Sequence, residues 1–106
     1  MKLSDRQKVF TFMIGELIRF AYDNGYCLTF GDAKRDRNAI YPYKVHPNSL
    51  HYDRLAVDFN LFKNGRYLKD TEDYLELGLF WESLGGAWGG RFRDANHFSL
   101  EYKGMK

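Results

Sequence analysis

The sequence predicts a single small α+β domain over residues 1–106, in which an antiparallel sheet is flanked by two helices. Two segments have the apolar period of amphipathic helices, and several shorter segments alternate or run apolar as strands do, with turn residues between them. The chain has 106 residues, of which 44% are hydrophobic and 18% aromatic, so it can build one core. This composition argues against intrinsic disorder.

The first element is expected to be a helix over about residues 9–22. Its apolar residues recur at steps of three and four, and Ser4 or Asp5 is placed to cap its start. Asn24-Gly25 supplies a stop signal. The residues predicted to form the apolar face of this helix are Val9, Phe12, Met13, Leu17, Phe20 and Ala21.

Two strands are expected on either side of a polar loop. Residues 26–30 form a short, mostly apolar segment, and residues 55–62 alternate between apolar and polar residues as a half-buried strand does. Between them, residues 32–50 contain both prolines of the chain and many polar residues, which predicts a loop with at most one short helix. Asn64-Gly65 predicts a tight turn after the second strand.

The C-terminal part is expected to contain a second helix and two further strands. Asp70 is placed to cap a helix that runs to about Leu84, and residues 87–91 and 97–102 are expected to be strands. The inner face of the helix is predicted to consist of Tyr74, Leu77, Phe80, Trp81 and Leu84. Four glycines after the helix indicate a tight turn or close backbone approaches: Gly85, Gly86, Gly89 and Gly90.

Two of the predicted strands each carry a potential metal ligand on a polar face. In residues 55–62 the ligand is Asp58, and in residues 97–102 it is His97. If both strands belong to one sheet, the two side chains can point to the same side. Aspartate is depleted in strands and costly to desolvate without a partner, and a bound cation would offset that cost.

A third potential ligand, His51, lies seven residues before Asp58. An odd offset places it on the opposite face of a continuous strand, and seven extended residues span roughly 23 Å. Zinc holds its ligand atoms at about 2.0–2.2 Å, so residues 52–54 must bend to bring His51 over the polar face. Two imidazoles and one carboxylate are typical of catalytic zinc, with the fourth position left for water.

The combined pattern resembles the zinc D,D-carboxypeptidase and L-alanyl-D-glutamate endopeptidase family, which includes VanY-type enzymes and many bacteriophage endolysins. The similarity covers roughly residues 26–102 and implies a Hedgehog/D,D-peptidase-like fold. It implies zinc-dependent hydrolysis of peptide bonds in peptidoglycan stem peptides, by an L-alanyl-D-glutamate endopeptidase or a D-alanyl-D-alanine carboxypeptidase. The motifs S-x-H, A-x-D and D-x-x-H-F stand here as Ser49-Leu50-His51, Ala56-Val57-Asp58 and Asp94-Ala95-Asn96-His97-Phe98.

The resemblance also implies a role for each matching residue. Asp94 would be the general base, and Arg35 would bind the substrate or stabilise the transition state. Ser49 would contact the substrate. The loop after Arg35 is shorter than the glutamine-rich helix common in the family, and Ser99 stands where the family usually has glutamate. One zinc ion per chain would be held by His51, Asp58 and His97.

Two other classes of function stay open. One is a non-catalytic cell-wall-binding module stabilised by a closed, structural zinc. Cys27 is expected in the core, although a reduced cysteine could fill a fourth zinc position. The other is a nucleic-acid binder, against which a net charge of only +2 argues. Its basic and aromatic residues would be Lys34, Arg35, Arg37, Tyr41 and Tyr43.

The sequence also leads to expectations about location and partners. Residues 1–8 are charged and lack an apolar stretch with a cleavage site, and no run approaches the roughly 18 apolar residues of a membrane span. We expect cytoplasmic synthesis without a signal peptide, and action on the cell wall after release by another factor. The expected partner is a peptidoglycan stem peptide, with no nucleic-acid or membrane partner. The chain is expected to be a monomer.

Overall fold

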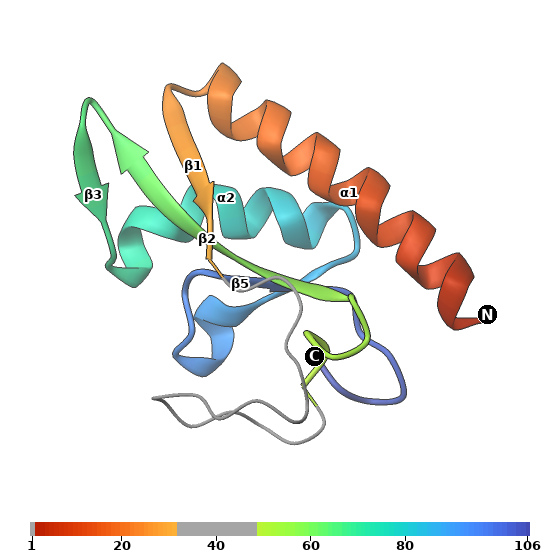
Figure 1. Ribbon diagram of the computed structural model, residues 1–106. Helices are drawn as coiled ribbons and strands as arrows, with labels where there is room; N and C mark the ends of the chain where they lie inside the picture. The colour runs from red at the N-terminus through yellow and green to blue at the C-terminus, as the bar shows by residue number, and fades with distance from the viewer. Residues whose placement is uncertain (1, 32–48) are drawn as a thin grey trace.

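The computed structural model describes residues 2–31 and 49–106, which form two α-helices and a five-stranded antiparallel sheet (Figure 1). Four strands follow the order β1-β2-β5-β4. Strand β5 pairs with the start of β2, and β3 pairs with its end. The predicted α+β class is confirmed. The elements are α1 (Leu3–Asp23), β1 (Tyr26–Phe30), β2 (Ala56–Lys63), β3 (Arg66–Leu68), α2 (Thr71–Ser83), β4 (Ala87–Trp88), the 3₁₀-helix η1 (Gly89–Phe92) and β5 (His97–Ser99).

Helix α1 is longer than predicted, and part of its predicted buried face is wrong. It begins at Leu3 with Lys2 at the cap position, so neither Ser4 nor Asp5 caps it. Phe12 is 69% exposed, and Phe10 takes its place in the core. Successive helical residues are rotated by about 100°, so Phe12 cannot share the inward face that Phe10 and Leu17 define. The buried residues of α1 are Phe10, Met13, Leu17 and Ala21.

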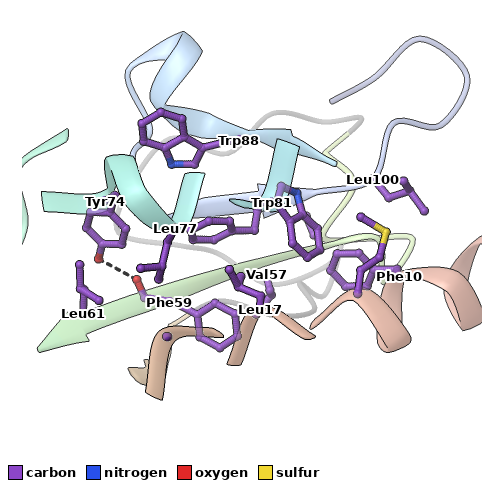
Figure 2. Close-up of a cluster of buried hydrophobic side chains, with 14 of the residues drawn as sticks. Phe10, Leu17, Val57, Phe59, Leu61, Tyr74, Leu77, Trp81, Trp88 and Leu100 are labelled. Atoms are coloured by element: carbon purple, nitrogen blue, oxygen red, sulfur yellow. Dashed lines mark hydrogen bonds between the residues drawn. The ribbon is translucent and has the colours of Figure 1, made fainter. Parts of the chain in front are cut away.

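Strand β2 is the centre of the sheet, and its predicted alternation is confirmed. It pairs with β1, β3 and β5, and Val57, Phe59 and Leu61 are buried. Helices α1 and α2 pack on this apolar face, where the Trp81 ring contacts Phe10 (Figure 2) and also contacts Phe98. Both ring pairs meet edge to face, with centroids 5.8 and 5.9 Å apart. The core therefore supports β2 from the side opposite its polar residues.

Three polar groups on large aromatic side chains tie α2 and β4 to β2, to β5 and to the turn before β5. The Tyr74 hydroxyl donates to the Phe59 carbonyl at 2.8 Å (Figure 2), and Trp81 Nε1 donates to the Ser99 carbonyl at 2.9 Å. Trp88 Nε1 donates to the Ala95 carbonyl at 2.8 Å. Buried aromatic residues with polar atoms need such partners, and two of the partners here, Ala95 and Ser99, flank His97 in the sequence.

The predicted start of α2 is confirmed. The Asp70 backbone N–H donates to the Asp73 carboxylate at 3.1 Å, and these two residues form a capping box. Tyr74, Leu77 and Trp81 are buried as predicted. The predicted members Phe80 and Leu84 are half-buried and pack at the edge of the core.

The remaining strands differ from the prediction in length and number. Strand β3 was not predicted; Asn64 and Gly65 both have positive φ, 53° and 77°, and this turn folds β3 back onto β2. Strand β4 has two residues instead of five because the chain continues as η1. Strand β5 ends at Ser99, not at residue 102.

Among the described residues, no helix combines the length and the apolarity that crossing a membrane requires.

Candidate metal centre

Two of the three candidate ligands lie directly opposite each other on paired strands. Strands β2 and β5 are antiparallel, and their register pairs Asp58 with His97. The Phe59 N–H donates to the Asn96 carbonyl at 3.0 Å, so Asp58 and His97 occupy a non-hydrogen-bonded pair, where opposite side chains approach most closely. The predicted placement of both side chains on one side of the sheet is confirmed.

The third candidate ligand, His51, comes from a tight turn that ends where β2 begins. The Tyr52 N–H donates to the Ser49 carbonyl at 3.1 Å, and the Leu55 N–H donates to the Leu50 carbonyl at 2.9 Å. Arg54 closes the turn with a left-handed backbone, at φ 57°. The bend predicted at residues 52–54 is confirmed, and it turns His51 back over the polar face of β2.

The side-chain atoms of the three residues converge on one point. His51 Nε2 lies 3.3 Å from Asp58 Oδ1, and His97 Nδ1 lies 3.5 Å from the same oxygen. All three candidate ligand atoms lie within 4.8 Å of one another. Tetrahedral ligands at about 2.1 Å from a zinc ion are about 3.4 Å apart. The two shorter distances therefore match the spacing of ligands around one metal ion, and this group could hold one.

The electrostatics of the group also suit a cation. Burial alone would raise the pKa of the Asp58 carboxyl, but hydrogen bonds with His51 and His97 and their charge outweigh burial and lower that pKa to about 2. His51 is 1% exposed and His97 is 5% exposed. A metal ligand must be deprotonated, and an Asp58 carboxylate with this pKa is ionised at neutral pH.

Asp94 lies at the solvent side of this group. Its Oδ2 is 3.7 Å from His97 Nδ1, and its side chain is 50% exposed. The Asp94 N–H donates to the Gly89 carbonyl at 2.8 Å, which closes the segment before β5. A Cβ on Gly89 would stand 1.9 Å from the Asp94 carbonyl oxygen. The close backbone approach predicted for Gly89 is confirmed, and it determines where Asp94 lies.

Two predicted site residues remain, Ser49 and Arg35, and the structure describes only Ser49. The Ser49 hydroxyl accepts a hydrogen bond from the His51 N–H at 3.2 Å, so Ser49 stabilises the turn that carries the ligand. Its predicted contact with the substrate stays a prediction. Arg35 lies outside the described residues, as do the other members of the basic and aromatic group from 34 to 43.

Cys27 was predicted in the core, and this is wrong. It is a free, exposed cysteine on β1, because the alternation of that strand buries its neighbour Tyr26 instead. Within residues 2–31 and 49–106, the group that could hold a metal consists of His51, Asp58 and His97 without a cysteine.

Two neighbours of the metal centre were not predicted. The Gly31 N–H donates to the Asp58 carbonyl at 2.7 Å, and a Cβ on Gly31 would lie 3.2 Å from the Asp58 Cβ. Phe92 packs edge to face against His97, with ring centroids 5.5 Å apart. A glycine at the end of a predicted strand is a signal for close approach. For Phe92 the sequence carries no such signal, because η1 was predicted as a strand.

The fold and this group define a small α+β domain with a candidate His-Asp-His metal centre. A family model described as D-alanyl-D-alanine carboxypeptidase, of the M15 peptidases, matches residues 44–100, which is more than half of the chain. The chain therefore belongs to this peptidase family. The matched segment includes all three candidate ligands and Asp94. No curated protein matches the chain.

Proposed function

We propose that this protein is a zinc-dependent peptidase that hydrolyses peptide bonds in peptidoglycan stem peptides. It would act as an L-alanyl-D-glutamate endopeptidase of the endolysin type or as a D-alanyl-D-alanine carboxypeptidase. The observation that carries the proposal is the convergence of His51, Asp58 and His97 on one point, inside the segment that the peptidase family model matches. Two histidines and one carboxylate form a ligand set of catalytic zinc sites.

The proposed roles follow from where each side chain lies. A zinc ion held by His51, Asp58 and His97 would supply a Lewis acid, which makes water a nucleophile at neutral pH. In this proposal Asp94, half exposed and 3.7 Å from the His97 ring nitrogen, accepts the proton of an attacking water; its distance and exposure support that role. It then returns that proton to the departing amine.

The resemblance to the family supports two further roles that belong to the proposal. Arg35 would bind the substrate and stabilise the developing oxyanion, since an arginine stays charged and can form two parallel hydrogen bonds. Ser49 would contact the substrate in addition to holding the His51 turn. The substrate lies in the cell wall, so the proposal includes delivery of the protein to the wall by another factor.

The experiment that tests the proposal is product analysis on purified peptidoglycan. Zinc-loaded protein is incubated with the polymer, and mass spectrometry identifies the released fragments. We expect new termini at the L-alanyl-D-glutamate bond or release of the terminal D-alanine, and the product decides between the two activities. Asp94→Asn is the matched control, which should keep zinc and lose most of the hydrolysis. Tight binding to the polymer by a zinc-loaded protein that releases no product would instead support the non-catalytic wall-binding module.

A further inference from the structure

The side of the sheet that carries Asp58 continues along β2 beyond the metal centre. Asn60 and Phe62 follow Asp58 at steps of two residues, so their side chains stand on the same side of the sheet. Strand β2 runs from its pairing with β5 to its hairpin with β3 (Figure 1). Phe62 is four residues after Asp58, which is about 14 Å along the strand. The two helices pack on the opposite, apolar side of β2.

The neighbouring strands add a partner to each of these two residues. Thr29 of β1 lies opposite Asn60, and Asn60 Nδ2 donates to Thr29 Oγ1 at 3.2 Å. Tyr67 of β3 lies opposite Phe62, and their ring centroids are 5.4 Å apart. Thr29 is exposed, Phe62 is half-buried and Tyr67 is 57% exposed. A polar strip, Thr29 and Asn60, therefore leads from the metal centre to an accessible ring pair, Phe62 and Tyr67.

The ring pair differs from other exposed aromatic residues in its position. A cross-strand aromatic pair stabilises a hairpin by itself, which is one use of these rings. Phe12 is also exposed, at 69%, but it belongs to α1, which packs on the opposite side of the sheet. The ring pair shares its side of the sheet with the candidate metal ligands. Exposed apolar groups that are continuous with a site are typical of a surface that a ligand covers.

The chemistry of this surface suits a sugar. The strip and the ring pair present an amide, hydroxyls and aromatic rings, and they include no carboxylate, ammonium or guanidinium group. The apolar C–H face of a pyranose packs on an aromatic ring, while its hydroxyl and N-acetyl groups exchange hydrogen bonds with amides and hydroxyls. Stem peptides carry free charges, whereas the disaccharide of peptidoglycan is neutral where the peptide is attached. The surface therefore matches the sugar part of the substrate better than the peptide part.

The length of the strip distinguishes the two bonds that the enzyme is proposed to cleave. The disaccharide of peptidoglycan is attached to the L-alanine of the stem peptide. One residue, about 3.5 Å when extended, separates the sugar from the L-alanyl-D-glutamate bond, and four residues, about 14 Å, separate it from the D-alanyl-D-alanine bond. With the first bond at the metal, the sugars cover the strip and reach the ring pair. With the second bond there, the peptide covers the strip and the sugars begin only beyond it.

We propose that the ring pair of Phe62 and Tyr67 is a glycan subsite. It binds the disaccharide of peptidoglycan while the L-alanyl-D-glutamate bond of the attached stem peptide lies at the metal centre. The inference rests on the proposed function and narrows it to the endopeptidase. The subsite makes a stem peptide that still carries its sugars a better ligand than the same peptide without them.

The test compares a disaccharide-tripeptide with the same tripeptide without sugars. Dissociation constants are measured by calorimetry on zinc-loaded protein that carries Asp94→Asn, so that the ligands are not consumed. We expect the sugars to improve binding by about tenfold, as one or two hydrogen bonds and a stacked ring provide. Adding Tyr67→Ala should remove most of this preference, whereas Tyr67→Phe keeps the ring and should keep it. Phe12→Ala is the matched control, which removes an exposed ring from α1 and should leave the preference unchanged.

Cys27 offers a second readout at the same place. It is exposed, it is the only cysteine of the chain, and it lies opposite Phe62 on β1. Side chains at opposite positions have their Cβ atoms about 4.5–5.5 Å apart. A sugar on the ring pair should therefore slow the alkylation of Cys27 by iodoacetamide, which mass spectrometry follows. The tripeptide without sugars should leave the alkylation rate unchanged.

Binding, stability and hydrolysis separate the outcomes. If Tyr67→Ala lowers the melting temperature and keeps the full preference for the sugars, the ring pair only stabilises the hairpin and the subsite is wrong. If the preference depends on Tyr67 and the wild-type protein cleaves no stem peptide, the subsite stands and the proposed catalysis is wrong. If the wild-type protein releases only the terminal D-alanine, the proposed peptidase stands and the subsite is wrong. A dimer that Tyr67→Ala dissociates would identify a second copy of the chain as the occupant and overturn the subsite.

Discussion

The candidate metal centre has a strand side and a turn side, and they are built differently. On the strand side, Asp58 and His97 face each other across β2 and β5, with the aromatic core behind them. On the turn side, His51 depends on a few local hydrogen bonds and on a left-handed Arg54. The strand side is held by long-range packing, whereas the turn side depends mainly on hydrogen bonds within a short segment, with one bond from Gln7 of α1 to the Asp53 carbonyl. We therefore expect substitutions on the two sides to differ in how much zinc binding and stability they remove.

The largest effect is expected from the strand side. Asp58→Ala or His97→Ala removes one of the three candidate ligands, so stoichiometric zinc binding and hydrolysis should both be lost. Metal analysis of the purified variants checks this. Asn60→Ala is the control, since Asn60 lies on the same face of β2 outside the group. Stoichiometric zinc of unchanged affinity in His97→Ala would contradict the assignment.

The next largest effect concerns Asp94, which supplies no candidate ligand and lies half exposed beside His97. Asp94→Asn should keep zinc and the fold but lower turnover by about 10²–10⁴-fold, because an amide cannot accept the proton of water. Steady-state hydrolysis of a stem peptide measures the loss. Glu101→Gln is the matched control, because Glu101 is paired with Lys106 at 3.9 Å instead of facing the centre. A loss of turnover in that control, with normal turnover in Asp94→Asn, would move the general base to Glu101.

Removal of the metal tests how much of the fold depends on the centre as a whole. We expect a chelator to abolish activity and lower the melting temperature while the chain stays folded, since α1, α2 and β2 supply most of the core. Circular dichroism with and without the chelator measures this. The Asp94→Asn protein should show the same shift, because it keeps its zinc ligands. Complete unfolding of the metal-free chain would indicate a structural zinc and favour the wall-binding module.

The smallest effect is expected on the turn side. Ser49→Ala removes the hydroxyl that accepts from the His51 N–H at 3.2 Å, in a residue only 8% exposed. The loss should lower stability by about 1–2 kcal/mol and weaken zinc binding by less than the loss of a ligand does. Competition titration against a zinc chelator measures the affinity. Ser83→Ala is the control, since its hydroxyl also forms a hydrogen bond with the backbone, to the Phe80 carbonyl, but is exposed at the end of α2. If Ser49→Ala loses zinc as completely as His97→Ala, the two sides do not differ.

The elements that the sequence predicted best are those whose signals are local. The alternation of β2 and the capping box of α2 each lie within a few consecutive residues, and both were confirmed. The start of α1 was missed because Lys2 carries no capping side chain, and Leu3 is helical through its packing on the core. Strand β3 was missed because most of it is exposed, so no buried face marks it in the sequence. Both misses concern residues whose structure depends on partners elsewhere in the chain.

The sequence by itself determined which faces carry His97 and Asp58, because side chains alternate along any strand. It also required a bend after His51, since a continuous strand would separate the ligands. Only the tertiary structure decided that the two strand ligands stand directly opposite each other, that Arg54 closes the bend, and that Asp94 lies against Gly89. The physical reason is that register and close approach depend on segments far apart in the sequence packing against one another. Local periodicity carries no information about that packing.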